Sequence, residues 1–192
     1  MKVYKVGIDL DEVLWRLVDA WLERYNKIAN EHVQAEDITE YYLDGFVKSP
    51  ETLYYILEMS DFWDHVELYE PEATTAALNK LLNDKRFEVY IVSATGTKVA
   101  TAKFRRVFEL LPMLKDENII LTNNKSIVDV DFMIDDYEEN LKGMVYAGGI
   151  PILINRPHNR AFPAEQYGII RKDSFAEAAE AVIRYVDLKI LV

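Results

Sequence analysis

Short apolar runs alternate with longer amphipathic stretches along most of the chain. The apolar runs predict β-strands at 3–8, 88–92, 119–121, 132–134 and 150–154. Runs without a polar alternation are typical of strands buried on both faces, as in a parallel sheet. Apolar residues at helical spacing predict helices over 14–28, 71–82, 98–111 and 174–186. This alternation predicts an α/β fold, with a Rossmann-like parallel sheet flanked by helices.

The stretch from Trp15 to Tyr69 breaks the alternation, because it contains helical patterns but no convincing strand. Within it, Ser49 followed by Pro50 is a helix start signal. We therefore expect a small helical cap at 15–69, inserted after the first strand, and a core domain made of 1–14 and 70–192. The aromatic residues of this stretch fit either the core of a small subdomain or the lining of a binding site.

Composition and charge narrow the class of protein. The chain has 192 residues, 50% hydrophobic and 29% charged, as in a globular protein of ordinary size. The formal net charge of −11 disfavours nucleic acid polymers and anionic membranes as partners, and no apolar run is long enough to span a bilayer. The chain has no cysteine, which excludes disulfides, thiolate catalysis and cysteine-based zinc sites. Together with the lack of a signal-peptide pattern, this leads us to expect a cytoplasmic protein.

Polar side chains follow the predicted strands at the edge where parallel sheets bind ligands. They are Asp9 and Asp11 after the first strand, Ser93 after the second, Lys125 after the third, and Asp135 with Asp136 after the fourth. Two converging carboxylates at about 4 Å repel by about 4 kcal/mol, so the cluster calls for a cation. Carboxylate oxygens without neighbouring histidine or cysteine indicate Mg²⁺. Mg²⁺, a lysine and a hydroxyl group together suit a phosphoryl group.

Other candidate motifs are weaker. A second Asp-x-Asp pair, Asp129 and Asp131, precedes a strand, where we expect it to serve a turn. The histidines His32, His65 and His158 are too scattered for a zinc site, although His158 could line the mouth of the phosphate site. The chain has neither a Gly-rich Lys-Ser/Thr phosphate loop nor a G-x-G-x-x-G fingerprint.

The strand-end motifs resemble those of the haloacid dehalogenase-like phosphotransferases. The segment Val6–Val13, with Asp9-Leu-Asp11, is similar to the first motif of that superfamily. Three later segments resemble the second, third and fourth motifs in the same order: Ile91-Val92-Ser93, Lys125 and Ile134-Asp135-Asp136. A narrower resemblance is to the 5′(3′)-deoxyribonucleotidase (cytosolic type C 5′-nucleotidase) family and its bacterial and phage relatives. It rests on Asp9-Leu-Asp-Glu-Val-Leu14, Phe62-Trp63 ahead of Glu70-Pro71, Leu121-Thr-Asn-Asn-Lys125, Ile134-Asp-Asp136 and Asn155-Arg-Pro-His-Asn-Arg160.

This resemblance implies a Mg²⁺-dependent phosphatase of nucleoside (deoxy)monophosphates with a helical cap after the first strand. Asp9 is the implied nucleophile, which forms an aspartyl-phosphate, and Asp11 the implied general acid and base. Ser93 and Lys125 are the implied catalytic residues that bind the phosphate oxygens. The implied metal ligands are Asp9, Asp11 through its backbone carbonyl, and Asp136, with Asp135 as second choice. The remaining substrate-binding candidates are Ala94, Phe46, Phe62 and Trp63.

Three positions depart from the family pattern: Glu12 stands where glycine is common, Ala94 where a hydroxyl residue is common in mammalian members, and Tyr137 where a basic residue often follows. An alternative is a phosphatase of the same superfamily that acts on another small phosphate, such as a sugar phosphate. More remote are a non-catalytic nucleotide-binding relative and a receiver-like signalling module. The intact set of Asp9, Asp11, Lys125 and Asp136 disfavours a non-catalytic relative. A receiver-like module is disfavoured because it has its acidic pair at the first strand and has no helical insert. The expected partner is a small phosphate monoester, and a homodimer is left open.

Overall fold

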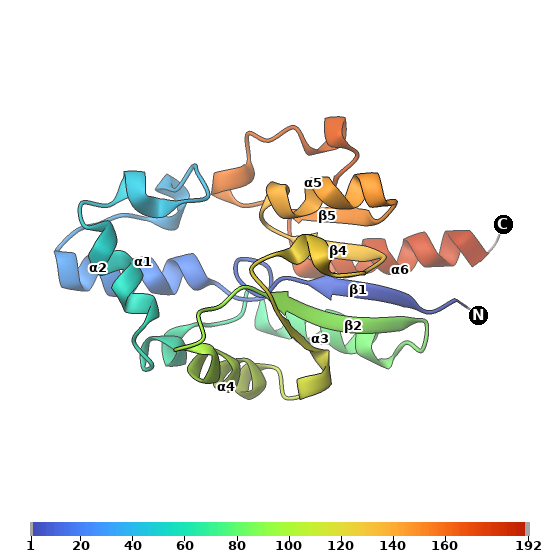
Figure 1. Ribbon diagram of the computed structural model, residues 1–192, viewed down its shortest axis with the longest axis horizontal. Helices are drawn as coiled ribbons and strands as arrows, with labels where there is room; N and C mark the ends of the chain where they lie inside the picture. Colours follow the sequence, from blue (N-terminus) through green and yellow to red (C-terminus); the bar gives the residue numbers. More distant parts are fainter. Residues whose placement is uncertain (1, 191–192) are drawn as a thin grey trace.

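The structure, a computed structural model, describes residues 2–190. Six parallel strands form one sheet in the order β3-β2-β1-β4-β5-β6 (Figure 1). They are β1 (Tyr4–Ile8), β2 (Phe87–Ser93), β3 (Ile119–Leu121), β4 (Phe132–Asp135), β5 (Ile150–Ile154) and β6 (Ile170–Lys172). The predicted Rossmann-like α/β fold is confirmed, and β6 is an edge strand that the apolar pattern did not predict.

Six α-helices accompany the sheet within the described residues: α1 (Leu17–Ala29), α2 (Pro50–Leu57), α3 (Pro71–Asn83), α4 (Ala100–Leu110), α5 (Glu138–Ala147) and α6 (Phe175–Ile190). The short 3₁₀ helices are η1 (Ala35–Asp37), η2 (Leu43–Phe46), η3 (Phe62–His65), η4 (Asp116–Asn118), η5 (Lys125–Ile127), η6 (Pro157–Asn159) and η7 (Ala164–Tyr167). Between residues 2 and 190, none of the helices combines the length and the apolar character needed to cross a bilayer.

The sheet separates two layers of core packing. Ile8, Ile91 and Ile134 belong to the large buried cluster that includes α3 and α6, whereas Val92 and Met133 belong to the cluster beneath α5. Neighbouring strand residues thus face opposite layers, as the period of two in a strand requires. Both layers are apolar, which explains why the strands read as continuous apolar runs.

We call residues 15–69, between β1 and α3, the insert. Its helices α1 and α2 lie beyond the carboxyl ends of the strands, at the left of Figure 1. The two linkers that join it to the sheet run side by side: the Arg16 N–H donates to the Glu67 carbonyl at 2.8 Å, and the Tyr69 N–H donates to the Leu14 carbonyl at 2.9 Å. The insert therefore faces the edge of the sheet at which the predicted site residues lie.

Candidate active site

The predicted strand-end residues meet at one edge of the sheet because β1 lies between β2 and β4. Asp9 directly follows β1, Asp135 ends β4, and Lys125 begins η5 after β3. The Lys125 ammonium Nζ lies 2.8 Å from Asp9 Oδ1 and 2.8 Å from Asp135 Oδ2. Burial alone would lower the pKa of Lys125, but attraction to the two carboxylates outweighs it and the pKa stands above its ordinary value.

Three buried carboxylates form the acidic centre of the site. Ligand atoms of Asp9, Asp135 and Asp136 all lie within 4.8 Å of one another. Burial, together with repulsion from the neighbouring carboxylates, raises the pKa of Asp9 well above its usual range, although Lys125 opposes the shift. The pKa of Asp135 is raised for the same main reason. Close, desolvated carboxylate oxygens are the ligands a hard divalent cation prefers, so these residues fit such an ion.

The two adjacent carboxylates of β4 have different surroundings. Asp135 accepts hydrogen bonds from Lys125 Nζ at 2.8 Å, the Tyr137 N–H at 2.9 Å and the Asn140 side-chain amide at 3.1–3.2 Å. Asp136 lines the cavity described below, and its Oδ2 lies 3.2 Å from His158 Nε2. Asp135 is therefore committed to the surrounding protein, which favours Asp136 as the ligand of an ion facing the cavity.

Asp11 has both carboxylate oxygens bonded to buried donors. Its Oδ1 accepts from the Trp15 indole N–H at 2.7 Å, and its Oδ2 accepts from Lys103 Nζ at 2.6 Å. The same ammonium group lies 3.0 Å from Ser93 Oγ and 3.2 Å from the Ala94 carbonyl. Lys103 thus links the polar ends of β1 and β2, and it holds Asp11 in one orientation.

Lys103 was not predicted from the sequence as a site residue. It is only 1% exposed and sits on α4 one turn after Val99 and one turn before Val107, both of them buried. A lysine on the apolar face of a helix is the signal that could have revealed it, because a buried ammonium group needs partners of opposite charge or polarity.

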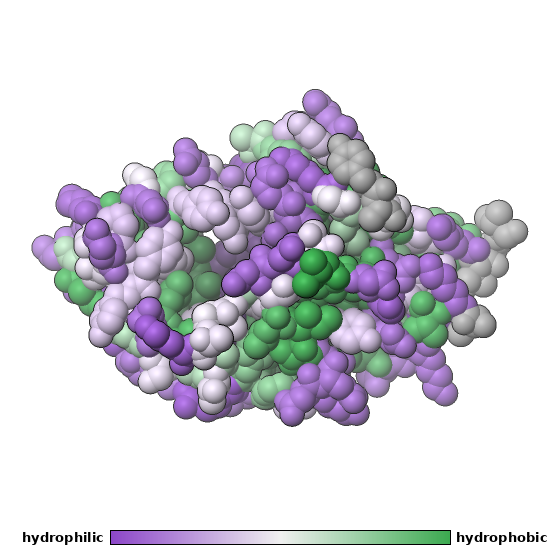
Figure 2. Space-filling view, in the orientation of Figure 1, coloured by the Kyte–Doolittle hydropathy of each residue, from purple (hydrophilic) through white to green (hydrophobic). Residues whose placement is uncertain are grey.

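A cavity of about 880 Å³ opens between the strand ends and the insert, within the size range of small-molecule sites. Figure 2 shows a hollow at this place. On the sheet side the cavity is lined by Asp9, Asp11, Ala94, Lys125 and Asp136. On the insert side its aromatic lining consists of Trp21, Tyr41, Tyr42, Tyr54 and Tyr69. The cavity thus joins an acidic end, whose carboxylates fit a divalent cation, to an aromatic end.

The aromatic lining differs from the one expected from the sequence, and this is a correction. Phe62 and Trp63 are buried in η3, and Phe46 packs against the main core cluster; all three are described by the structure, and none of them lines the cavity. The reason is that Trp63 stacks on the linker residue Trp15, with 6.0 Å between ring centroids. The Phe62 ring packs on Trp63 in turn, with 5.2 Å between their centroids. These side chains stabilise the base of the insert.

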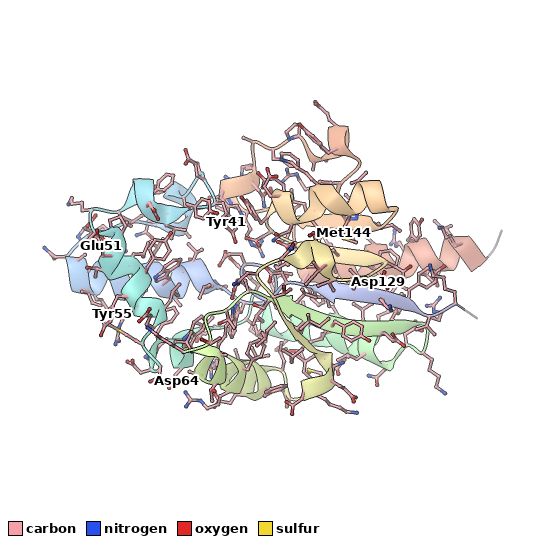
Figure 3. The ribbon with its side chains drawn as sticks, viewed as in Figure 1. Tyr41, Glu51, Tyr55, Asp64, Asp129 and Met144 are labelled. Atoms are coloured by element: carbon pink, nitrogen blue, oxygen red, sulfur yellow. The ribbon has the colours of Figure 1, made fainter. Side chains whose placement is uncertain are left out.

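Tyr41 closes the cavity where the insert meets the loop after β4. Its ring stacks on Tyr137 with 3.7 Å between centroids, and it meets the edges of Tyr42 at 5.3 Å and His158 at 5.8 Å. In Figure 3, Tyr41 lies on the side of the insert that faces the core of the protein. Burial, reinforced by nearby Asp136, raises the pKa of Tyr41, so its hydroxyl is neutral at physiological pH.

The remaining predicted residues have simpler surroundings. Ser93 is fully buried behind Ala94, and its Oγ contacts Lys103 rather than the cavity. Asp131 accepts from the Lys5 N–H at 2.9 Å and Asp129 pairs with the Lys5 ammonium at 2.8 Å, so this second Asp-x-Asp pair contacts β1, where the sequence predicts a role in a turn.

The fold is similar to that of several solved hydrolase structures. A haloacid dehalogenase-like hydrolase from Streptococcus pneumoniae superposes with a TM-score of 0.63 at 13% identity, covering 96% of this chain and 98% of that chain. A haloacid dehalogenase-like hydrolase from Bacillus subtilis, bound to magnesium, gives 0.59 at 13% identity, covering 94% and 99%. The architecture is therefore that of the haloacid dehalogenase-like hydrolases.

Sequence comparison then identifies the family. The profile of the family "5′ nucleotidase, deoxy (Pyrimidine), cytosolic type C protein" matches residues 2–188. A 5′(3′)-deoxyribonucleotidase from Clostridium acetobutylicum is 36% identical over 159 residues, covering 81% of this chain and 84% of its own length. One from Bacillus subtilis is 28% identical over 157 residues, covering 81% and 87%. This chain belongs to the cytosolic type C 5′ nucleotidase family of phosphoric monoester hydrolases, which confirms the sequence resemblance.

Proposed function

We propose that this protein is a Mg²⁺-dependent phosphatase that hydrolyses nucleoside (deoxy)monophosphates through an aspartyl-phosphate on Asp9. The observation that carries the proposal is the convergence of Asp9, Asp135 and Asp136 within 4.8 Å, with Lys125 2.8 Å from the first two. The nucleotidase family and its named relatives support a nucleotide as the substrate. The aromatic end of the cavity supports the same substrate, because nucleobases stack on aromatic rings.

Asp9 is the proposed nucleophile. The Leu10 N–H and Lys125 Nζ both contact its Oδ1 at 2.8 Å, which fixes the plane of the carboxylate. One Asp9 oxygen forms a bond to phosphorus while the bond from phosphorus to the ester oxygen breaks. Mg²⁺ held by Asp9, Asp136 and the Asp11 carbonyl would offset the carboxylate charge and polarise the phosphoryl group. Lys125 would stabilise the negative charge on the transferring group.

Asp11 is the proposed general acid and base. In the first step it gives a proton to the departing ester oxygen, which leaves as the alcohol of the nucleoside. In the second step it takes a proton from water as the water oxygen attacks phosphorus. The bond between phosphorus and Asp9 then breaks, phosphate is released, and both carboxyl groups return to their starting states. Its place on the cavity wall suits both proton transfers, and one of its contacts with Trp15 and Lys103 gives way while it carries the proton.

We also propose that residues 15–69 act as a cap over a core formed by 1–14 and 70–192. The cap would supply the aromatic surface for the nucleoside, while the core would hold the phosphate. Ala94 lines the phosphate end of the cavity without a hydroxyl group, so its contribution is limited to the backbone. A cytosolic location is supported by the family description.

The direct test of the proposed function is a substrate panel with and without Mg²⁺. The purified protein is incubated with deoxyribo- and ribonucleoside monophosphates phosphorylated at the 5′ or 3′ position, and with sugar phosphates. We expect nucleotides to be the best substrates, and chelation with EDTA to lower turnover by about 10²-fold or more because the carboxylates lose their counter-charge. Turnover of sugar phosphates alone would favour the alternative substrate class, and full activity in EDTA would contradict the metal.

Replacing Tyr41 with alanine tests the aromatic end of the cavity. Loss of base stacking, worth about 1–3 kcal/mol per base, is expected to raise KM for nucleotides by about tenfold. The kcat/KM for 4-nitrophenyl phosphate, which has no nucleoside, should change little. Tyr55→Ala is the matched control, because Tyr55 is 61% exposed on α2 and points away from the cavity lining. An equal effect of Tyr41→Ala on both substrates would contradict base stacking.

A further inference from the structure

Glu12 occupies a backbone position that disfavours it. It directly follows Asp11, and its φ of 56° lies in the left-handed region that suits glycine. Glu70, at the other crossing between insert and core, also has a positive φ, of 39°. Strained non-glycine residues persist where surrounding contacts hold them, and they gather at functional sites. The contacts of the Glu12 side chain should therefore account for its presence.

Glu12 is buried, with only 7% of the residue exposed, and both of its carboxylate oxygens accept hydrogen bonds. Oε1 accepts from the Val18 N–H at 2.8 Å, and Oε2 accepts from the Tyr69 hydroxyl at 2.6 Å. The Glu12 carbonyl accepts from Arg156 Nε at 2.7 Å. The Arg156 guanidinium in turn lies 4.0 Å from the centroid of the Tyr69 ring.

The partners of Glu12 come from three separate parts of the chain. Val18 lies in the first turn of α1, where the chain has entered the insert, and Tyr69 lies where the chain returns to the sheet. Arg156 belongs to the loop after β5. One side chain, four residues after the end of β1, thus connects the start of α1 with the returning linker, and its own backbone is held by the loop after β5.

We propose that Glu12 is a positioning residue that fixes the insert relative to the phosphate end of the cavity and so determines specificity for the nucleoside part of the substrate. The inference rests on the proposed function. The acidic centre belongs to the sheet, whereas Trp21, Tyr41 and Tyr54 belong to the insert. The distance between the two ends of the cavity therefore depends on the linkers that Glu12 joins.

The contacts argue against a role for Glu12 as a metal ligand. Its two carboxylate oxygens already accept from Val18 and Tyr69, and in the part of the chain that the structure describes the metal-binding group consists of Asp9, Asp135 and Asp136. The Glu12 carboxylate therefore acts as a brace between the start of α1 and the linker that contains Tyr69.

The experiment compares Glu12→Gly, Glu12→Gln and wild type on a nucleoside monophosphate and on 4-nitrophenyl phosphate. Glycine removes the brace and relieves the backbone, so the fold should survive. We expect Glu12→Gly to lower kcat/KM for the nucleotide by about tenfold or more, mainly through KM, with less than about threefold change for the aryl phosphate. Glutamine can still accept from Val18 and donate to the Tyr69 oxygen, so it should lie close to wild type.

Amide hydrogen exchange provides a second readout that needs no substrate. The Val18 N–H is bonded directly to Glu12, so its exchange should accelerate by about tenfold or more in Glu12→Gly. Glu67→Gln is the matched control, because Glu67 is an exposed carboxylate on the second linker and should affect neither measurement.

Two results would overturn the proposal: unchanged exchange at Val18 in Glu12→Gly, or equal losses on the two substrates. Failure of the proposed function has a different signature, because wild type itself would then turn over no nucleotide. In that case the exchange measurement still decides whether Glu12 braces the linkers.

Discussion

Asp9→Asn is expected to lower phosphatase turnover by about 10⁴-fold or more, the scale on which enzymes lose activity when a covalent nucleophile is removed. The amide oxygen of asparagine is a poor nucleophile toward phosphorus, and the substitution also removes one charge from the proposed metal site. The measurement is the rate of phosphate release from a nucleoside monophosphate and from 4-nitrophenyl phosphate at saturating Mg²⁺. Turnover of both substrates should fall, because Asp9 attacks phosphorus in both of them, whichever group leaves.

The same substitution is expected to stabilise the protein when metal is absent. The pKa of Asp9 is raised by burial above its unfolded value of about 3.9, so the ionised form is disfavoured in the folded state and stability falls as pH rises above that value. Asparagine carries no charge, so its advantage should grow with pH. A relief of about 1 kcal/mol corresponds to about 2–4 °C for a chain of this size. Thermal melting in EDTA from pH 4.5 to 8 measures this trend.

Asp129→Asn is the matched control for this experiment. Asp129 opens the other Asp-x-Asp pair, and its side chain is 94% exposed beside Lys5. We expect wild-type turnover and melting from this variant. Adding Mg²⁺ should raise the melting temperature of wild type and of Asp129→Asn more than that of Asp9→Asn, because binding to the folded state alone stabilises it. Retained turnover in Asp9→Asn would refute the assigned nucleophile.

The sequence predicts the sheet well because its central strands are buried on both faces. The runs that contain Ile8, Ile91 and Ile134 read as apolar for that reason. The edge strand β6, Ile170–Lys172, is partly exposed and contains two basic residues, so it has no apolar run. Helix α5, Glu138–Ala147, was missed because most of its apolar residues follow one another near its end and do not recur at helical spacing.

The charged centre of the site was predictable for a topological reason. Parallel strands direct their carboxyl ends to one edge, so residues that follow neighbouring strands meet whatever their distance in sequence. Lys125, Asp9 and Asp135 meet for this reason. Aromatic residues in loops follow no such rule. Nothing in the local sequence distinguishes Tyr41, which lines the cavity, from Trp63, which packs on Trp15, because tertiary packing decides between them.

Lys103 shows how a helix can complete a site formed by strand ends. Its ammonium group lies 2.6 Å from Asp11 Oδ2 and 3.0 Å from Ser93 Oγ, yet it does not line the cavity. The ring centroids of Trp15 and Trp63 lie 5.8 and 5.3 Å away. Its position therefore suits control of the orientation of Asp11 rather than contact with the substrate.

Lys103→Met is accordingly expected to act through the proposed general acid. Methionine keeps the length of the apolar stem, and Asp11 loses one of its two donors and can rotate away from the leaving group. Turnover of a nucleoside monophosphate should fall by about 10²–10³-fold, within the range that general acid catalysis contributes. The pre-steady-state release of 4-nitrophenolate, which departs without protonation, should slow by less than about tenfold, whereas the second step, in which Asp11 is the base, is common to both substrates.

The contrast between the two substrates separates this role from a general loss of structure. Asp11→Asn should show the same contrast, and the double variant should be no slower than Asp11→Asn alone, because the two residues act as one unit. Lys98→Met is the matched control, since that side chain is 80% exposed just before α4. Equal losses in the rate of leaving-group release from both substrates, or additive losses in the double variant, would show that Lys103 supports the site by some route other than Asp11.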